Sequence, residues 1–276
     1  MVISLKSLNA CPLCHSGNSR KWYDFDPIHV FECRDCSFQY LNPCLDGESM
    51  AASYETEESL SALNDFYEGY YDYGNLDKDS GTLREIKQCL NVLDSYYAGP
   101  KGGPKKLFEI GAGNGFFLAA AKQSGWEVSG VESSGKNADI AREKFSVSLT
   151  QGLFEDFDGK PESFDAVVMR DVLEHRYDPH AFLAQAAKLV KKGGLMLVAV
   201  PNVASLLQYL SKAIYFISGK RLSMGLRKVY LLEHTGYYDS RTLGELFRAE
   251  GLEPLKTFQA STDLAKFRLS ASERFM

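Results

Sequence analysis

The residues with the clearest chemical potential are four cysteines near the start of the chain. Cys11 and Cys14 form one Cys-x2-Cys pair, and after eighteen intervening residues Cys33 and Cys36 form a second. Each pair can place two sulfur atoms on one side of a tight turn, so two pairs can complete a tetrahedron around Zn²⁺. We therefore predict a four-thiolate zinc site. Because four sulfurs fill the coordination shell, the predicted ion is structural and not catalytic.

The alternative for these cysteines is a set of reduced, unconnected thiols. His15 and Cys44 lie close enough in sequence to compete as ligands, but each pair already supplies its two sulfurs. Segments 20–24 and 29–32, between the two pairs, have the composition of short strands. The sequence thus predicts a small zinc ribbon.

A glycine-rich segment is the second pattern with chemical meaning. Glycines at 111, 113 and 115 follow an apolar segment, where they allow a tight turn and a close approach of a ligand to the backbone. Phe116 occupies the position where a dinucleotide fingerprint needs another glycine. Glu132 ends the next predicted strand, where a carboxylate can accept hydrogen bonds from both ribose hydroxyls. The pattern favours a nucleoside ligand with a positive centre and an amino-acid end.

Each of these acids also has a purely structural interpretation. Glu109, at the end of the strand before the turn, could bond to the glycine loop. Glu132 could cap a helix or be solvated.

The elements that must position these residues alternate along the chain. Apolar segments predict strands over 106–110, 128–132, 147–150, 164–169 and 195–200, and helices over 116–124, 136–145 and 179–190. This alternation predicts an α/β fold with a Rossmann-like, mostly parallel sheet and right-handed crossovers, preceded by the small zinc ribbon.

The glycines and prolines of residues 99–104 mark a domain entry point. We expect a zinc-ribbon module over 1–48, a helical linker or lid over 49–100, and the ligand-binding domain over 101–276. The aromatic span 66–73 is either core packing or a lid over a ligand.

Taken in order, the motifs of residues 104–260 resemble class I S-adenosylmethionine-dependent methyltransferases. The resemblance rests on segments 109–115, 163–168, 171–175 and 192–194, on Glu132, and on the strand that ends in Pro201 and Asn202. The Cys-x2-Cys pairs are similar to the N-terminal zinc module of a subgroup that includes sugar-modifying enzymes. The resemblance implies that S-adenosylmethionine is the methyl donor.

The resemblance also implies roles for individual residues. The glycine loop would hold the methionine portion of the donor, Glu132 the ribose hydroxyls, and loop 152–155 the adenine. Many relatives place an acid where Leu153 stands, so backbone groups or Glu155 would contact the adenine amino group here. The full implied donor-binding set is Glu109, Gly111, Gly113, Asn114, Gly115, Glu132, Ser133, Leu153, Phe154, Arg170 and Asp171.

A hydroxyl acceptor has to lose its proton during methyl transfer, and histidine is suited to accept it near neutral pH. His175 and His234 are the candidate catalytic bases. Each could instead be a structural histidine. His29 and His180 look peripheral to the predicted site.

Residues 203–232 combine apolar residues at helical spacing with five basic residues and no acid. The basic residues are Lys212, Lys220, Arg221, Arg227 and Lys228. Three interpretations follow: a lid that admits an anionic acceptor, an amphipathic helix in peripheral contact with a membrane, or an ordinary insertion with solvated lysines.

The composition and net charge of the chain also limit the classes of function that we expect. The net charge of −5 and the 45% hydrophobic content are typical of a globular protein and give no strong nucleic-acid signal. We find no secretory or membrane-spanning pattern and expect a cytoplasmic protein. The leading hypothesis is a methyltransferase acting on a small molecule or a glycan, including a nucleotide-linked or lipid-linked sugar. The alternatives are an RNA methyltransferase whose ribbon contacts nucleic acid, and a non-catalytic binding module.

Overall fold

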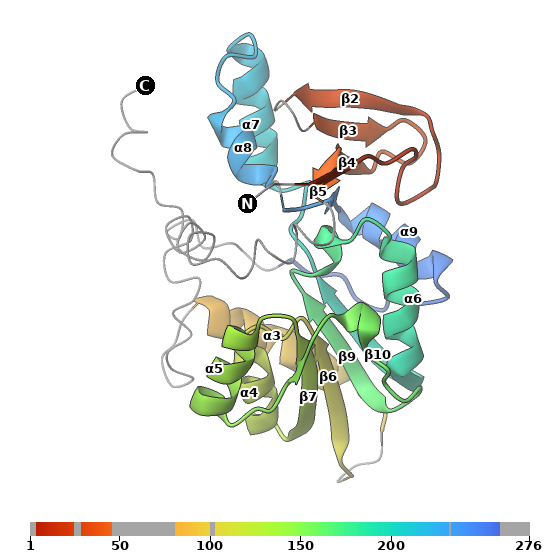
Figure 1. Cartoon of the computed structure of the whole chain (residues 1–276), viewed down its shortest axis with the longest axis vertical. Helices are drawn as coiled ribbons and strands as arrows, with labels where there is room; N and C mark the ends of the chain where they lie inside the picture. Colours follow the sequence, from red (N-terminus) through yellow and green to blue (C-terminus); the bar gives the residue numbers. More distant parts are fainter. Residues whose placement is uncertain (1–3, 25–28, 46–80, 100–102, 232, 260–276) are drawn as a thin grey trace. The chain divides into compact units, whose positions relative to one another are not determined.

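The computed structural model describes residues 4–24, 29–45, 81–99, 103–231 and 233–259 (Figure 1). The chain forms two compact units. The first comprises residues 1–50, 169–188 and 198–257, and the second comprises residues 51–168, 189–197 and 258–276. Most of the predicted linker, including the aromatic span 66–73, lies outside the described residues.

The second unit contains most of a five-stranded sheet with the order β10-β9-β6-β7-β8 in the described part of the chain. The strands are β6 (Lys105–Ile110), β7 (Trp126–Glu132), β8 (Thr150–Gln151), β9 (Phe164–Arg170) and β10 (Val190–Ala199). β6 pairs with β7, and β7 with β8, in parallel. The prediction of a Rossmann-like, mostly parallel sheet is confirmed.

Three helices bury apolar residues in one core with the sheet: α3 (Gly81–Tyr96), α4 (Phe116–Gln123) and α5 (Gly135–Phe145). Helix α6 (Pro179–Leu189) precedes β10 in the chain. Leu83, Ile86 and Leu90 recur at helical spacing on α3 and are buried with Leu107 of β6. Burial of each such side chain stabilises the fold by about 1.5–3 kcal/mol. Figure 1 shows α3, α4 and α5 gathered beside β6 and β7.

The strand predicted over 147–150 is wrong except at its last residue, because the chain first completes the end of α5. Ser146 adopts a left-handed conformation with φ 53°, and the Val147 N–H donates to the Ala141 carbonyl at 3.1 Å. These contacts satisfy carbonyls at the helix end. Val147 is therefore buried as part of a helix cap, and β8 begins only at Thr150.

The first unit contains a sheet with the order β11-β4-β3-β2. Its strands are β2 (Ser19–Asp24), β3 (His29–Cys33), β4 (Gln39–Asn42) and β11 (Gly236–Tyr237), and β1 (Leu5–Lys6) pairs separately with β5 (Cys44–Leu45). The remaining elements are α7 (Leu206–Ile217), α8 (Met224–Val229) and α9 (Ser240–Ala249), with one-turn helices η1 (Phe154–Asp156) in the second unit and η2 (Leu173–His175) in the first.

The ribbon shares a hydrophobic core with a segment almost 200 residues away in sequence. Tyr23, Val30 and Leu41 are buried with Leu226 and Tyr230 in one cluster. The Tyr230 hydroxyl donates to the Gln39 side chain at 2.6 Å. The ribbon strands and the α7–α8 pair are drawn next to each other in Figure 1. The ribbon therefore packs within the first unit, against residues of α8 and Tyr230.

Candidate functional site

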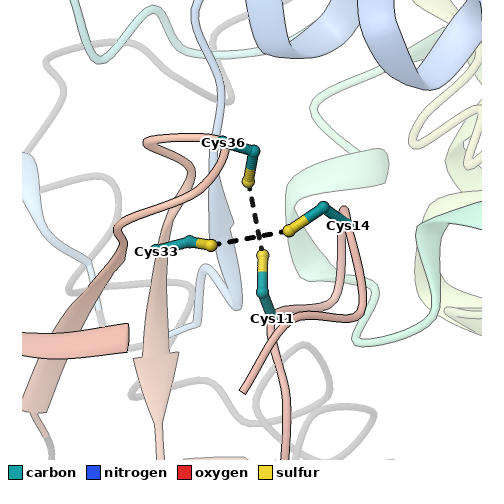
Figure 2. Close-up of side chains that lie close together, drawn as sticks. All are labelled: Cys11, Cys14, Cys33 and Cys36. Atoms are coloured by element: carbon teal, nitrogen blue, oxygen red, sulfur yellow. Dashed lines mark hydrogen bonds between the residues drawn. The ribbon is translucent and has the colours of Figure 1, made fainter. Parts of the chain in front are cut away.

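The four predicted zinc ligands come together. Their sulfur atoms all lie within 4.8 Å of one another and face a common centre (Figure 2). The Cys11 and Cys36 sulfurs are 3.6 Å apart, and those of Cys14 and Cys33 are 3.5 Å apart. A tetrahedral zinc ion with Zn–S bonds of about 2.3 Å needs sulfurs roughly 3.8 Å apart, so the donor set fits zinc.

The two cysteine turns have the same backbone pattern. The residue after each second cysteine, His15 or Ser37, adopts a left-handed conformation with φ 59°. In both turns that residue's N–H donates to the carbonyl of the first cysteine at 2.9 Å. The thiols of both pairs face the common centre, so each turn supplies one half of the candidate site.

Two side chains from distant helices hold the backbone of these turns. Arg241 of α9 donates to the Cys36 carbonyl at 2.7 Å. His180 of α6 bonds through Nε2 to the Leu13 carbonyl at 2.7 Å and through Nδ1 to the Glu250 carboxylate at 2.6 Å. His180 therefore has a structural role at the first cysteine turn.

The glycine-rich turn after β6 has the conformation that its sequence predicts. Gly111, Gly113 and Gly115 have φ values of 66°, 53° and 76°, in the left-handed region that favours glycine. A Cβ on Gly115 would lie 2.8 Å from the Ala141 Cβ, so packing against α5 also requires a glycine there. A Cβ on Gly113 would meet nothing within 4 Å, so this position opens onto free space.

Glu132 lies beside the open glycine. One of its carboxylate oxygens accepts the Gly113 N–H at 2.8 Å, and the other accepts the Ser134 N–H at 2.9 Å. A carboxylate has about four lone-pair positions, so each oxygen keeps one acceptor position. The buried Glu132 thus shapes the turn and can still accept hydrogen bonds from a diol.

The other predicted donor-binding residues of the second unit differ in what they offer a ligand. Glu109 is buried at the end of β6, and the Asn114 side chain accepts the Phe116 N–H at 3.3 Å. Ser133 is half-buried. Leu153 is exposed, whereas Phe154 is buried and stacks on the Phe157 ring. Leu153 therefore has the more available side chain of the two.

Arg170 and Asp171 belong to the first unit, at the end of β9. Asp171 has φ 52°, a conformation that aspartate tolerates better than most residues. Its N–H donates to the Ala199 carbonyl at 3.0 Å, and its side chain is exposed.

The two predicted catalytic histidines lie together. The rings of His175, on η2, and His234, just before β11, have centroids 4.9 Å apart and an interplanar angle of 81°. The His175 Nδ1–H donates to the Glu233 carbonyl at 2.8 Å. A third residue, Glu174, joins them, and the ligand atoms of all three lie within 4.8 Å of one another.

Burial shifts the protonation equilibria of this cluster. It lowers the pKa of His175 to about 4 and, together with the adjacent His175, holds the pKa of His234 well below its usual range. Burial and the nearby Asp171 carboxylate raise the pKa of Glu174 well above its usual value. Both imidazoles are therefore neutral at pH 7.

The sequence gives no role to Glu174. A glutamate followed by a histidine and then an arginine is ordinarily expected at the surface, yet Glu174 is 1% exposed. Its position directly before His175 was the one available signal, and only the folded chain brings His234 to it.

The strand order, the left-handed glycine turn and the adjoining carboxylate define a Rossmann-like fold of the class I methyltransferase type. Residues 84–257 match the family described as "Methyltransferase domain", and the chain belongs to this family. None of the helices in the described segments is long and apolar enough to cross a membrane.

Solved and curated proteins extend the comparison. The structure of magnesium protoporphyrin IX methyltransferase from Synechocystis PCC 6803, with bound SAH, has a TM-score of 0.57 at 15% identity and covers 79% of this chain and 94% of that chain. Ubiquinone biosynthesis O-methyltransferases from Maricaulis maris and Rhodopseudomonas palustris are 32% and 36% identical over 106 and 104 residues. These matches cover 36% and 35% of this chain, and 42% and 40% of those relatives.

Proposed function

We propose that this chain transfers a methyl group from S-adenosylmethionine to a hydroxyl group of a small molecule. The observation that carries the proposal is the open, left-handed Gly113 beside the Glu132 carboxylate. A ligand can approach the backbone there without meeting a side chain, and a carboxylate acceptor is in place for a ribose diol. The fold shared with an SAH-bound methyltransferase and the similarity to O-methyltransferases support this choice.

In this proposal the glycine turn and Glu132 hold the donor, Leu153 covers one face of the adenine, and Arg170 and Asp171 serve its methionine end. The donor would supply an electrophilic methyl group on a good leaving group. Much of the catalytic effect then comes from positioning the two reactants. His175 and His234 are the groups proposed to act on the acceptor hydroxyl, and as neutral imidazoles they have a lone pair to offer.

Calorimetry with S-adenosylhomocysteine tests the donor site. Glu132→Ala removes a charged acceptor and should weaken binding by about 1–3 kcal/mol, or roughly 5- to 150-fold. Glu127→Ala is a matched control because Glu127 lies on the same strand with an exposed side chain. Equal affinity in the two variants, or no binding by the folded wild-type protein, would refute the donor assignment.

The acceptor is tested by following transfer of a labelled methyl group to a panel of phenols, sugar nucleotides and lipid-linked sugars. We expect turnover with at least one hydroxyl-bearing member, and reduced turnover in His234→Ala with unchanged donor affinity. Donor binding without turnover on any acceptor would favour a non-catalytic binding module. Salt-sensitive binding of RNA, with methylation of RNA alone, would favour the nucleic-acid alternative.

We also propose that Cys11, Cys14, Cys33 and Cys36 bind a structural zinc ion. The four converging sulfurs and the two equivalent turns support this assignment. Cys33→Ser should release zinc, as measured by elemental analysis, whereas the same change at Cys89, which lies in the core cluster of the second unit, should leave the zinc content at one ion per chain. Equal zinc content in the two variants would contradict the proposal.

The proposal of a membrane contact rests on helix α7, because this helix buries polar side chains and exposes apolar ones. The buried residues of α7 include the polar Gln208 and Ser211, whereas Leu206, Ile214 and Ile217 are 74%, 53% and 87% exposed. A helix on the surface of a globular protein normally buries its apolar side and exposes its polar side. The exposed side of α7 therefore has the character of a docking surface.

We propose that the exposed side of α7 binds an anionic lipid membrane. Lys220, Arg221 and Arg227 are exposed close to the apolar side of α7 in sequence, and residues 203–232 contain no acid. An interfacial helix combines apolar side chains that insert into the membrane with basic side chains at its surface. Each lysine or arginine near an anionic membrane contributes about 1 kcal/mol to binding.

Co-sedimentation with vesicles tests the lipid contact. The protein should bind vesicles that contain phosphatidylglycerol and not pure phosphatidylcholine, with binding lost as salt rises. Leu210→Ser with Ile214→Ser should abolish binding, whereas Leu255→Ser, at an exposed leucine elsewhere, should not. The proposal is refuted if the protein does not bind these vesicles. It is also refuted if the protein is a dimer that dissociates when Leu210 and Ile214 are both replaced by serine.

A further inference from the structure

Helix α7 places two polar side chains on the side that faces the ribbon. Gln208 and Lys212 are four residues apart, so their side chains lie on the same side of the helix. The Lys212 ammonium lies 6.0 Å from the centre of the Tyr230 ring, which belongs to the buried cluster of the ribbon. Tyr215, about one turn further along α7, packs on Tyr23 of β2 with ring centroids 5.2 Å apart. The side of α7 that carries Gln208 and Lys212 is therefore the side next to the ribbon.

The Gln208 side chain offers a hydrogen-bond acceptor that the fold does not use. The residue is 5% exposed, and its buried Oε1 atom has no hydrogen-bond donor within the described part of the chain. Buried polar atoms are almost always paired, because an unpaired atom keeps the full cost of leaving water. The Gln208 oxygen therefore indicates a donor group, such as a hydroxyl, that a bound molecule supplies.

Lys212 is half-buried and forms no ion pair with the described residues. The carboxylate whose charge acts on it is Glu32 of β3, and both oxygens of Glu32 are engaged elsewhere. One accepts from the Arg20 guanidinium at 2.6 Å, and the other accepts from the Gln39 amide at 3.1 Å. Burial lowers the pKa of Lys212, and the charge of Glu32 offsets part of this effect. An anion bound beside the ammonium would replace the hydration that burial removes.

Two tyrosine rings connect Lys212 to one of the proposed bases. The Tyr230 ring, which lies under Lys212, has its centroid 4.8 Å from that of Tyr237. The Tyr237 ring in turn has its centroid 6.1 Å from that of His234. Both tyrosines are buried, so this packing fixes the position of Lys212 relative to His234 within the first unit. An acceptor whose hydroxyl group reaches His234 therefore has a cation in the same unit for an anionic part.

We propose that Gln208 and Lys212 bind the acceptor of methyl transfer, and that this acceptor is a phosphorylated sugar. The inference rests on the function proposed above and adds the chemical class of the substrate. A sugar hydroxyl supplies the donor that the Gln208 oxygen lacks, and a phosphate group supplies the anion that suits Lys212. Free sugar phosphates, nucleotide-linked sugars and lipid-linked sugars share this chemistry.

The competing interpretation is that water satisfies the polar side of α7 and that Lys212 only adds to the positive charge of the segment. Calorimetry without methyl donor separates the two interpretations. The probes are a panel of hexose phosphates and nucleotide-linked hexoses, each compared with the same hexose without phosphate. A further arm compares vesicles that carry a polyprenyl-phosphate-linked hexose with vesicles that lack it, which identifies a lipid-linked source.

We expect at least one phosphorylated hexose to bind at least about tenfold more tightly than its unphosphorylated counterpart. Lys212→Met should weaken binding of that ligand by about ten- to a hundredfold and remove the preference for phosphate, whereas Lys212→Arg should retain the preference. Gln208→Leu removes the acceptor and should weaken binding by about two- to tenfold. Lys220→Met is the control, because Lys220 is an exposed lysine just beyond α7 and its loss changes the net charge equally.

The state of the fold is checked in each variant by near-ultraviolet circular dichroism. If Lys212→Met fails to fold, the phosphate preference of the wild-type protein and its change in Gln208→Leu carry the test. The inference is overturned if no phosphorylated sugar binds to protein that still binds S-adenosylhomocysteine, or if Lys212→Met and Lys220→Met weaken binding equally. Binding of the sugar phosphate without any binding of S-adenosylhomocysteine would instead refute the proposed methyl transfer.

Discussion

The substitution Gly113→Ala, which adds one methyl group, distinguishes the conformational role of the glycine turn from its proposed role in donor binding. Gly113 has φ +53°, and a Cβ there would meet no atom within 4 Å. Gly113→Ala should therefore cost only the left-handed conformation of a non-glycine residue, about 1–2 kcal/mol of the free energy of unfolding. Gly193 is a matched position, with φ +74° and no atom within 4 Å of its Cβ. Gly193→Ala should cost the same amount.

Only Gly113→Ala should impair donor binding. The new methyl group would occupy the space left for the ligand, and overpacking of this size costs about 1–3 kcal/mol, or roughly 5- to 150-fold in affinity. Chemical denaturation measures the loss of stability, and calorimetry with S-adenosylhomocysteine measures the affinity. If both variants bind the ligand as tightly as the wild-type protein, the free space at Gly113 is not the donor site. If Gly113→Ala alone unfolds, the turn is held by contacts other than those described.

Three further changes test the first unit. Leu226→Ala, at a fully buried side chain in the ribbon core, should lower the free energy of unfolding by about 2–5 kcal/mol and speed the release of zinc to a chromophoric chelator. Asp239→Ala removes the cap whose carboxylate accepts the Thr242 N–H at 2.7 Å, and should cost about 1 kcal/mol in chemical denaturation without changing zinc release. His180→Ala should speed zinc release, because its ring no longer holds the Leu13 carbonyl, and a rate equal to that of the wild-type protein would contradict this role.

The parts of the fold that could be predicted from the sequence depend on short-range rules. A Cys-x2-Cys turn closes its own hydrogen bonds, and a glycine at a left-handed position reflects a conformation that other residues avoid. The strands and helices of the α/β sheet also follow from apolar spacing within a dozen residues. For this reason the cysteine turns, the Gly113 turn and most element boundaries agree with the sequence prediction.

The features that could not be predicted depend on contacts between distant segments. β11 is two residues long, too short for a pattern, and exists because Gly236 and Tyr237 pair with β4. The burial of Glu174 likewise depends on the chain returning to it at Thr235. The inverted polarity of α7 is a third case, since apolar spacing identifies a helix but not which side the rest of the protein covers.

These distant contacts connect the cysteine-bearing ribbon to the cluster of Glu174, His175 and His234. The Leu41 N–H of β4 donates to the Thr235 carbonyl at 2.9 Å, and the Thr235 N–H donates to the Glu174 carbonyl at 2.7 Å. The Thr235 hydroxyl also donates to the His175 carbonyl at 3.4 Å. One residue thus joins the ribbon sheet to η2 and carries His234 beside it. Because β4 follows directly from the second cysteine turn, the zinc ion proposed at this turn would also order the strand that bonds to Thr235, next to His234. The ribbon sheet therefore supports the Glu174–His175–His234 cluster through the backbone of Thr235.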